Sequence, residues 1–493
     1  MEKSDGKKFW ESGFARSRIT SEKVTLPEIL FGYLIGPFGA LLSSGIFTSI
    51  LQNYFTDVLK LNLTFLSALQ LVSTVFIIAA NLIVGQLIER TKCMAGKARP
   101  WILLSALTLS VSSTLMFIVP FQGTLKYVWI AVAYHLFYAV AFPIYSTANS
   151  TLVPVSTRDS EKRGTLASAA NIAGLAVMGA GSMVFPILVS FALKEDQNLW
   201  LLTMVAVALF SALAIYLQYR YTRERVTEEG RDEAKETGVK SQSVSLKKQL
   251  KAATGEKMWW IILLFYLSFQ WSGSLKNGSM SYFCKWVLDN TFFGSADAWG
   301  VSQSVLSIMG AVPMALAAVF VVPLCHKFGK RKVCMAGMLV GCAGGLAALL
   351  GNGEILPVAA GVALKCLGSA PACYMILAML ADVIDHIEYK TGIRTDGLTM
   401  SIYSSIMVAG TPICNAVFSG LLKACRYDQT ADVALGTLAQ TVQVQRVITV
   451  SYIGIETAAY LLCAVLLIFF TVEKNLAQEQ KAIAAGKTGE ELP

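Results

Sequence analysis

The strongest constraint on this chain is a series of twelve apolar runs, each long enough to cross a membrane as a helix. The runs cover residues 27–52, 63–88, 100–120, 127–153, 165–193, 199–219, 258–287, 300–324, 333–351, 355–381, 396–424 and 445–472. About twenty helical residues span the roughly 30 Å of hydrocarbon in a bilayer, and continuous apolar runs do not fit the alternating strands of a barrel. Charged residues make up 15% of the chain, against about 25% in soluble proteins. We therefore predict an all-α membrane protein with twelve transmembrane helices.

A charged segment separates the runs into two groups of six. Residues 220–257 contain ten Lys and Arg residues and seven acidic residues, which is typical of a linker. Loops at equivalent places in the two groups resemble each other, and such weak internal symmetry is typical of transporters with a site between two repeats. We predict two pseudo-symmetric six-helix bundles. The predicted parts are a cytoplasmic N-terminal segment 1–26, an N-terminal bundle 27–219, a cytoplasmic linker 220–257, a C-terminal bundle 258–472 and a cytoplasmic tail 473–493.

The basic residues predict the orientation of the chain. Lys and Arg gather in the loops after the second, fourth and eighth runs and in the linker. Cytoplasmic loops carry such an excess, so we predict a multi-pass protein of the cell membrane with both termini cytoplasmic. The net charge of +9 is then a matter of topology, and no nucleic acid partner is expected. The ten cysteines form no Cys-x-x-Cys pair, so we expect no disulfide framework and no metal site.

Three segments carry a more specific pattern. Residues 54–59 (YFTDVL) close the first run, residues 85–90 (GQLIER) and 96–101 (GKARPW) bridge the second and third, and residues 381–397 (ADVIDHIEYKTGIRTDG) follow the tenth. Together they resemble the glycoside–pentoside–hexuronide:cation symporters, the melibiose permease-like family of the major facilitator superfamily. The resemblance covers all twelve runs. It implies the major facilitator fold and transport of sugars or glycosides, including uronides, by alternating access between two states.

The charges of these loops suit a gate that opens and closes in each cycle. Exposed ion pairs are worth about 0–1 kcal/mol and break easily, while topology alone requires Lys and Arg but not so many acids. We predict that acids of one half pair with bases of the other when the protein is closed on the cytoplasmic side. The alternative is that the charges only fix topology. The predicted gate residues are Arg90, Lys97, Arg99, Arg163, Asp382, Asp385, Glu388 and Arg394.

The membrane interior departs from the family pattern. The two aspartates that the family uses for its cation in the second span align with Ile77 and Asn81, and an Asn carbonyl is at most one weak ligand for Na⁺. The family's other charged positions fall on Leu41, Ser146, Asn171 and Val408. We therefore expect proton-coupled or uncoupled transport rather than sodium coupling.

Polar and aromatic side chains remain inside the runs. Tyr138, Tyr145 and Asn149 recur at spacings of seven and four, so they share one face of the fourth run. Hydroxyls, amides and an aromatic plate such as Trp271 suit the recognition of polyols, although small polar residues also support helix packing. The predicted substrate-binding residues are Tyr138, Tyr145, Ser146, Asn149, Asn171, Trp271, Lys276, Asn277, Lys365, Tyr374, Tyr403 and Ser404.

Ionisable groups inside the runs are rarer and more informative. Lys365 and Glu456 each lie about ten residues into a run, and such groups are costly in hydrocarbon unless they face a partner or a cavity. One interpretation is a structural pair of Lys365 with Glu456. The other is that Lys365, together with Lys276, meets an anionic group such as a uronate or a sulfonate. His135 fits a hydrogen-bonded packing role better than a proton relay. The predicted coupling candidates are Asn81, His135 and Glu456.

These observations predict a secondary transporter of a sugar, glycoside or uronide-like solute that acts as a monomer in the lipid bilayer, with a proton as the coupling ion if there is one. Two alternatives are a transporter of a non-sugar organic anion and a membrane sensor that binds a solute without transporting it. An enzyme is disfavoured because no nucleophile–base set, acid cluster or metal-ligand spacing appears at a membrane surface. No cofactor is expected.

Overall fold

The computed structural model describes residues 16–91, 93–157, 160–228, 246–393, 395–476, 478–479 and 481. Its regular elements are all helices. The chain divides into two compact units, Met1–Lys240 and Ser241–Pro493. We call them the N half and the C half and describe each by itself.

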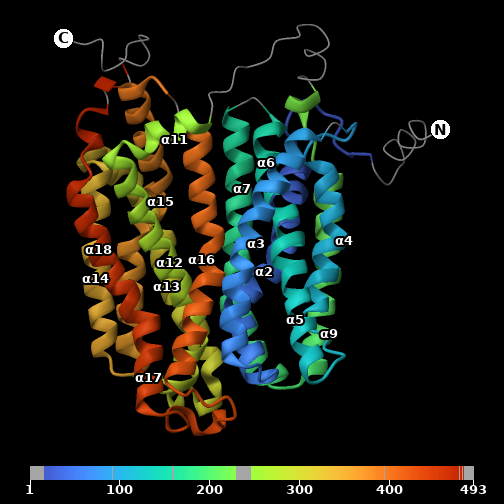
Figure 1. Ribbon diagram of the computed structural model, residues 1–493, viewed down its shortest axis with the longest axis vertical. Coiled ribbons are helices and arrows are strands. Elements are labelled where there is room, and N and C mark those ends of the chain that lie inside the picture. The colour runs from blue at the N-terminus through green and yellow to red at the C-terminus, as the bar shows by residue number, and fades with distance from the viewer. Residues whose placement is uncertain are drawn as a thin grey trace. The chain divides into compact units, whose positions relative to one another are not determined.

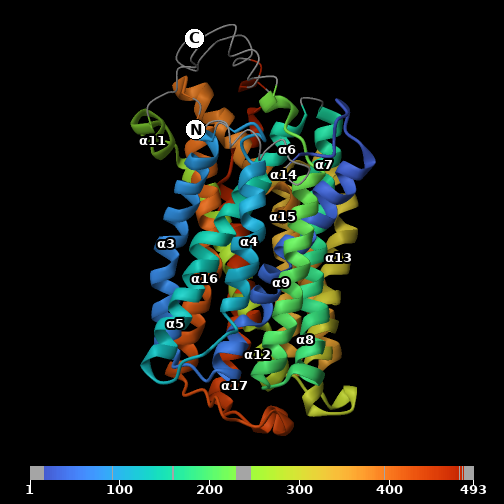
Figure 2. The ribbon, with the colours of Figure 1, turned by 90° about the vertical axis from the view of Figure 1, so that its right-hand side faces the viewer.

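The N half contains six long helical passages, some of them interrupted by short π-helical stretches (Figure 1). Its elements are η1 (Glu28–Ile35), α2 (Gly36–Asn53), η2 (Tyr54–Val58), α3 (Leu63–Arg90), α4 (Arg99–Leu115), α5 (Thr124–His135), η3 (Leu136–Ala141), α6 (Phe142–Ser156), α7 (Ser160–Gly179), η4 (Ala180–Val184), α8 (Phe185–Leu188), η5 (Val189–Leu193) and α9 (Gln197–Arg220). Within this half α4 runs beside α9 (Figure 2), and α2 also packs against α9.

The C half repeats this plan with an extra short helix before its first passage. Its elements are α11 (Leu246–Thr254), α12 (Lys257–Trp286), η6 (Thr291–Phe293), η7 (Ala296–Ala298), α13 (Trp299–Phe328), α14 (Lys330–Leu350), α15 (Ile355–Thr391), α16 (Asp396–Ala424), η8 (Val433–Leu438), α17 (Val442–Thr449), η9 (Val450–Gly454), α18 (Ile455–Phe469) and η10 (Val472–Lys474). Here α14 packs against both α15 and α18 (Figure 1).

The helices agree with the twelve predicted spans to within a few residues at most ends. Ten helical passages of the described chain are long and apolar enough to cross a membrane by length and composition. The other two predicted spans correspond to α4, which has 17 residues, and to α12, which has 30 residues including Lys276 and Lys285. The largest difference is at α15, which continues to Thr391. Residues 382–391 thus continue the helix instead of forming the loop that their charges predict.

Large aromatic side chains fill the interior of the N half. Trp200 of α9 is 1% exposed, and its ring stacks on that of Phe117 with centroids 5.9 Å apart. The ring of Tyr54 lies 4.5 Å from Phe117 and 5.1 Å from Trp200. Such rings bury large apolar areas and lock helices together. In the C half the core lies between α12, α14, α15 and α18.

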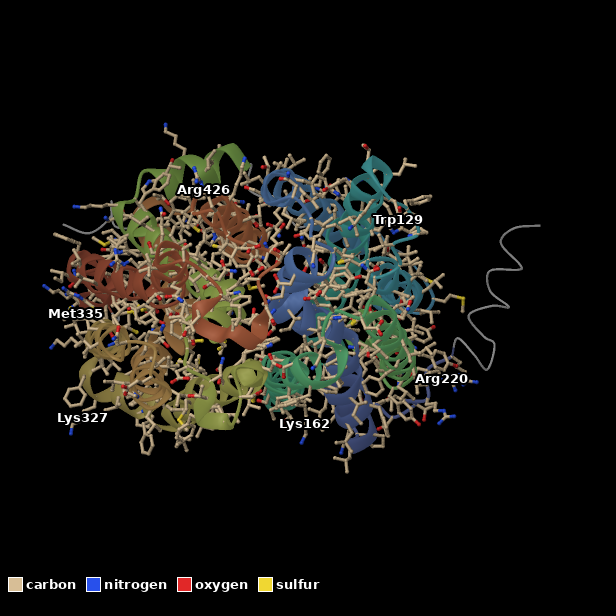
Figure 3. The ribbon with its side chains drawn as sticks, turned by 90° about the horizontal axis from the view of Figure 1, so that it is seen from below. Trp129, Lys162, Arg220, Lys327, Met335 and Arg426 are labelled. Atoms are coloured by element: carbon tan, nitrogen blue, oxygen red, sulfur yellow. The ribbon has the colours of Figure 1, made fainter. Side chains whose placement is uncertain are left out.

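Apolar side chains also cover the outside of the helices. On α13, Val312, Leu316, Val319 and Phe320 are 51%, 62%, 70% and 64% exposed, and their spacing puts them on one face of the helix. A water-soluble surface rarely leaves so many apolar residues together, whereas lipid contact requires them. Figure 3, which looks along the helices, shows basic side chains such as Lys327 and Arg220 at the rim of their own halves.

A buried glutamate closes one end of the N half. The carboxylate of Glu224, which is 1% exposed, accepts the backbone N–H groups of Lys97, Ala98 and Arg99 at 2.7, 2.9 and 2.9 Å. These groups start α4 and lack partners within the helix, and a negative charge is favourable there. The preceding Gly96 has φ +114°, and a side chain at this position would collide with the carboxylate of Glu224. We call this arrangement the glutamate clasp, and this end of the half its basic end.

The C half has the same clasp at its own basic end. Glu473 accepts the backbone N–H groups of Lys330 and Arg331 at 2.6 and 3.0 Å at the start of α14. The preceding Gly329 has φ +89°. Both glutamates lie in the same sequence pattern of aromatic, Thr, any residue, Glu and a basic residue, at residues 221–225 (YTRER) and 470–474 (FTVEK). The two halves therefore share this way of capping a helix start.

Candidate functional site

Three ionisable side chains from three helices of the C half meet in one cluster. Lys276 lies on α12, Lys365 on α15 and Glu456 on α18. The Nζ of Lys365 lies 2.5 Å from Oε2 of Glu456, and the Nζ of Lys276 lies 3.7 Å from Oε1 of the same carboxylate. Tyr460, one helical turn after Glu456, donates its hydroxyl to Oε1 at 2.9 Å. One carboxylate therefore faces two ammonium groups and one hydroxyl.

Close helix packing explains why Lys365 is sealed from its surroundings. A side chain at Gly344 of α14 would collide with the backbone of Lys365, and one at Gly345 would collide with Thr457 of α18. Small residues allow membrane helices to approach in this way. Lys365 is consequently 0% exposed, and its Nζ lies 5.5 Å from the centre of the Tyr452 ring. The structural pair with Glu456, one of the two interpretations from the sequence, is present in the structure.

The cluster is unequal in charge and in exposure. Two lysines and one glutamate in their ordinary charge states leave a net charge of +1. Neither lysine has a second carboxylate partner within the described part of the chain. The side chain of Lys276 is 22% exposed, whereas those of Lys365 and Glu456 are 0% and 3% exposed. Because a buried charge is costly without a partner, the unpaired positive charge is best placed on Lys276.

The aromatic candidates of the C half take part in packing. Trp271 of α12 donates its indole N–H to the carbonyl oxygen of Ile406 on α16 at 3.1 Å. The ring of Tyr403 stacks on that of Tyr266 with centroids 4.2 Å apart. These contacts join α12 to α16 and hold the helix that carries Lys276.

The other polar candidates of the C half are more exposed. Tyr374 is 38% exposed, and its hydroxyl donates to the carbonyl oxygen of Met314 at 3.3 Å. Ser404 is exposed, and Asn277 is half-buried next to Lys276 in the sequence. Their role in binding stays a prediction.

A neutral network occupies the interior of the N half. Tyr145 of α6 is fully buried and donates its hydroxyl to Oε1 of Gln218 on α9 at 2.8 Å. Gln218 in turn donates its Nε2 to Oδ1 of Asn149 at 2.7 Å. The structure thus brings together two predicted residues through Gln218, which the sequence analysis missed. Gln218 is the only amide in the run 199–219, and this is the signal that would have found it.

The remaining N-half candidates are spread out. Tyr138 packs in an aromatic group, with its ring 4.5 Å from Tyr134 and 5.0 Å from Phe137. Ser146 is half-buried, and its hydroxyl points back to the carbonyl oxygen of Pro143 at 3.5 Å. Asn171 is exposed on α7.

The two N-half coupling candidates make local hydrogen bonds. Nδ1 of His135 lies 2.7 Å from the carbonyl oxygen of Ala131, and its Nε2 lies 3.1 Å from Oγ of Ser73. Both ring nitrogens are thus occupied, as expected for a packing histidine. Asn81 donates its amide to the carbonyl oxygen of Ile77 at 2.8 Å, one turn earlier on α3.

The predicted gate residues that the structure describes lie at the basic ends of their halves. Arg99 is buried, and its guanidinium donates to the carbonyl oxygens of Ala95 and Tyr219 at 3.2 and 3.1 Å. Asp382 accepts the Nζ of Lys330 at 2.6 and 2.9 Å. Each of these two residues therefore has partners within its own half.

The other gate residues differ in burial. Arg90 and Lys97 are exposed, and Asp385 and Glu388 are half-buried. Arg394 and the side chain of Arg163 lie outside the described residues. The gate between the halves stays a prediction.

Comparison with known proteins places this architecture in a family. A sequence model of the family described as MFS/sugar transport protein matches residues 32–474. The isoprimeverose transporter of Lactiplantibacillus pentosus is 27% identical over 460 residues, which cover 90% of this chain and 88% of that protein. A glucuronide carrier protein homolog of Escherichia coli (strain K12) is 21% identical, over 90% of this chain and 91% of that protein. The crystal structure of the nucleoside transporter NupG matches with a TM-score of 0.60 at 13% identity, over 90% of this chain and 99% of that chain.

These matches confirm the predicted fold class, an all-helical major facilitator fold of two six-helix bundles. They also confirm that the protein is a transporter of a small solute and not an enzyme. The predicted membership of the glycoside–pentoside–hexuronide:cation symporters is confirmed as well, and the chain belongs to the MFS/sugar transport protein family.

Proposed function

We propose that this chain transports sugars or glycosides that carry an anionic group, such as uronides, by alternating access. The observation that carries this proposal is the cluster of Lys276, Glu456 and Lys365, with its net charge of +1 and its single partly exposed lysine. An anionic solute at Lys276 supplies the missing negative charge. Two ammonium groups then face two carboxylates, which is the balance that a low-dielectric interior favours.

The geometry supports a division of roles between the two lysines. Lys365 lies 2.5 Å from Glu456 and is fully buried, so it holds the carboxylate in place. Lys276 lies 3.7 Å from the same carboxylate and is 22% exposed, so its ammonium group can turn to a solute at little cost. Lys276 is therefore the residue we assign to the anion, and Lys365 is its support.

The name of one relative supports this class of solute. One of the similar proteins is named a glucuronide carrier protein homolog, and a glucuronide carries a carboxylate on its sugar ring. The hydroxyls and amides of the neutral N-half network are suited to the uncharged part of a sugar. We propose that the half-buried Asn149 serves this purpose, and that Gln218 and the fully buried Tyr145 hold it in place.

The test is uptake by the purified protein in liposomes. We expect labelled glucuronide to be taken up faster than the corresponding neutral glucoside. Lys276→Gln should lower uptake of the glucuronide by about tenfold or more and leave uptake of the glucoside largely unchanged, because a charge-assisted contact is worth about 1.5–3 kcal/mol. Lys365→Gln should impair both solutes alike. Equal loss of both solutes in Lys276→Gln would refute the assignment.

We further propose that transport is not coupled to sodium, and that a coupling proton acts through Glu456. The positions where the family holds two aspartates carry Ile77 and Asn81, neither of which has a carboxylate, and the amide nitrogen of Asn81 donates to the backbone carbonyl of Ile77. Glu456 is the acid that touches the solute-binding lysine. Replacing choline by Na⁺ in the uptake buffer should leave the rate unchanged, whereas an inward proton gradient should raise it. A clear stimulation by Na⁺ would show that the sodium part is wrong.

A further inference from the structure

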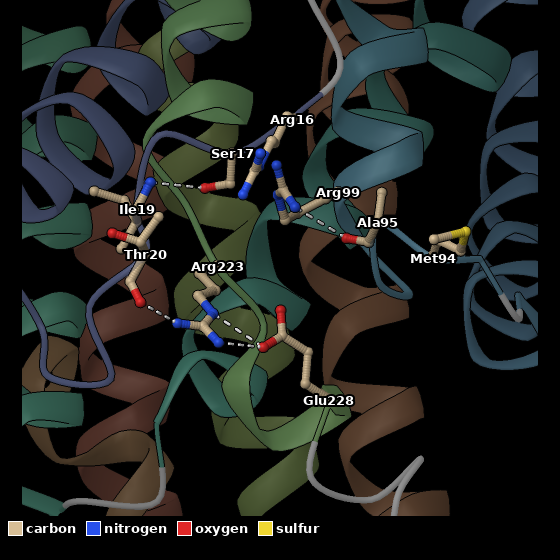
Figure 4. A pocket seen from close by; sticks show the side chains of 9 residues that line it. All are labelled: Arg16, Ser17, Ile19, Thr20, Met94, Ala95, Arg99, Arg223 and Glu228. Atoms are coloured by element: carbon tan, nitrogen blue, oxygen red, sulfur yellow. Dashed lines mark hydrogen bonds and ion pairs between the residues drawn. The ribbon is translucent and has the colours of Figure 1, made fainter. Parts of the chain in front are cut away.

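A pocket lies at the basic end of the N half, apart from the residues of the proposed transport site. Three segments line it, namely residues 16–20, residues 94–99 before α4, and residues 223–228 after α9 (Figure 4). Its volume is about 330 Å³, which is many times the space that one water molecule needs. The pocket is therefore large enough for a small anion with an organic group attached.

The side chains around the pocket are unequal in charge. Three arginines, Arg16, Arg99 and Arg223, face a single carboxylate, Glu228. That carboxylate is already paired, because Nε and Nη2 of Arg223 lie 2.9 and 2.8 Å from its Oε2. Arg223 also donates Nη1 to the carbonyl oxygen of Thr20 at 2.7 Å. Glu228 therefore makes no ion pair with the other two arginines, Arg16 and Arg99.

Arg99 is a buried charge with an incomplete set of partners. Its side chain is 5% exposed and reaches two backbone carbonyls, but its buried Nε has no acceptor among the described residues. The nearby carboxylate of Glu224 holds the three backbone N–H groups of the clasp and interacts with Arg99 through its charge, but it makes no direct hydrogen bond or ion pair with that guanidinium. A buried guanidinium donor without an acceptor is unusual, and it lies in the wall of the pocket.

Arg16, on the segment of residues 16–20, is the second arginine of the pocket that lacks a carboxylate partner among the described residues. It is exposed and makes no hydrogen bond or ion pair with any residue that the structure describes. Figure 4 shows the guanidinium groups of Arg16 and Arg99 on the same side of the pocket, away from Glu228. Two like charges on one side of a pocket repel each other unless an anion lies between them.

We infer that this pocket binds a phosphate group between Arg16 and Arg99. Planar guanidinium groups match phosphate oxygens with two parallel hydrogen bonds each. A phosphate group has enough oxygens to accept two hydrogen bonds from each of the two guanidinium groups, whereas a carboxylate has only two oxygens. The bound phosphate fastens residues 16–20 to the loop that starts α4 and so stabilises the basic end of the N half. The phosphate comes either from a phospholipid headgroup, since the pocket lies at the end of membrane helices, or from a soluble phosphate compound.

The test measures binding of inorganic phosphate to the purified full-length protein in a phosphate-free detergent. Isothermal titration calorimetry should give saturable binding, and the thermal unfolding midpoint should rise with phosphate but not with chloride at equal ionic strength. Arg16→Gln should weaken binding by about tenfold, the effect of one lost charge-assisted contact. Because Arg16 is exposed, this variant should fold, which Arg99→Gln need not do.

A matched control is available two residues away. Arg18→Gln removes the same charge from the same segment, but Arg18 donates to the hydroxyl of Tyr221 and does not line the pocket. Phosphate should bind this variant as it binds the wild type. Equal weakening in the two variants, or an equal response to phosphate and chloride, would overturn the inference.

The source of the phosphate is distinguished by a second arm in nanodiscs. Protein in phosphatidylcholine alone is compared with protein in phosphatidylcholine that contains added phosphatidylglycerol. If the site binds an anionic lipid headgroup, phosphatidylglycerol should weaken the binding of inorganic phosphate. This effect of the lipid should disappear in Arg16→Gln. Unchanged binding assigns it to a soluble phosphate compound.

Discussion

At the basic end of the N half Glu224 accepts three backbone N–H groups from the start of α4, and in the C half Glu473 accepts two from the start of α14. In the interiors the halves differ. The C half holds an ion cluster around Glu456, whereas the N half holds a neutral chain of hydrogen bonds through Gln218. The two halves thus share the glutamate clasp at a helix start. They differ in the polar groups of their interiors, which a solute could contact.

This contrast has a physical reason. Every helix start has N–H groups without partners inside the helix, so a clasp of this kind can serve either half whatever solute is transported. A charged interior is costly in hydrocarbon and is kept only where it has a use. We therefore expect changes in the C-half cluster to alter both stability and solute choice, and changes in the clasps to alter stability alone.

The largest effect should come from Glu456→Gln. This change leaves the ammonium groups of Lys276 and Lys365 in a buried site without their carboxylate, and breaking a buried pair in this way costs about 3–5 kcal/mol. Thermal unfolding of the purified protein should show a large fall in the midpoint. Combining Glu456→Gln with Lys365→Met should restore part of the loss, because the stranded charge is removed as well.

A control for this prediction is Glu354→Gln. Glu354 precedes α15, is exposed, and makes no side-chain cap to the helix. Its replacement should leave the unfolding midpoint nearly unchanged. If Glu456→Gln were as stable as Glu354→Gln, the cluster would not be the paired site described here.

A smaller and graded effect is expected at the clasps. Glu224→Gln and Glu473→Gln each weaken charge-assisted bonds to a helix start, which are worth about 1.5–3 kcal/mol. The loss should be greater for Glu224, which accepts three N–H groups, than for Glu473, which accepts two. Thermal unfolding of both variants shows which of the two loses more stability. The ratio of glucuronide uptake to glucoside uptake should stay the same in both. A larger loss in Glu473→Gln than in Glu224→Gln would contradict the claim that the two clasps stabilise their halves in the same way.

The smallest effect concerns an ion pair nearer the surface of the C half. Burial raises the pKa of Glu256, but the hydrogen bond and charge of Lys390 outweigh it, so the pKa lies below its ordinary value. A lowered pKa stabilises the fold above the unfolded value, about 4.3, and this contribution disappears as the pH falls through the folded value. Lys390→Gln should therefore cost about 0–1 kcal/mol at pH 7, and this cost should shrink as the pH falls below the unfolded value. A loss that did not shrink as the pH was lowered would argue against this pair.

The positions of the helices were largely predictable from the sequence, because apolar run length fixes a membrane span. The end of α15 was not, since Asp382 and Glu388 read as a loop although they lie on the helix. The clasp was also missed. Its glutamates are separated from their N–H partners by more than a hundred residues, but the repeated pattern of residues 221–225 and 470–474 was visible in the sequence.

The candidate site was predictable as a set of residues but not as an arrangement. Lys276, Lys365 and Glu456 stand out because ionisable residues are rare in membrane helices. Which lysine is sealed depends on the glycine contacts between α14, α15 and α18, and these follow from three-dimensional packing. Gln218 was missed for a related reason, since a single amide in a span has meaning only once its partners Tyr145 and Asn149 are known.

The central claim is that Lys276 recognises an anionic group of the solute, and ligand binding tests it most directly. Isothermal titration calorimetry should measure binding of a glucuronide and of a glucoside with the same aglycone to the wild type, Lys276→Gln and Lys285→Gln. Lys285→Gln is the control, because Lys285 lies on the same helix but against the ring of Trp299. We predict that Lys276→Gln weakens binding of the glucuronide by about tenfold or more and leaves the glucoside within about twofold, while Lys285→Gln keeps the wild-type preference. Equal weakening of both ligands in Lys276→Gln, or an unchanged preference for the glucuronide, would contradict the account.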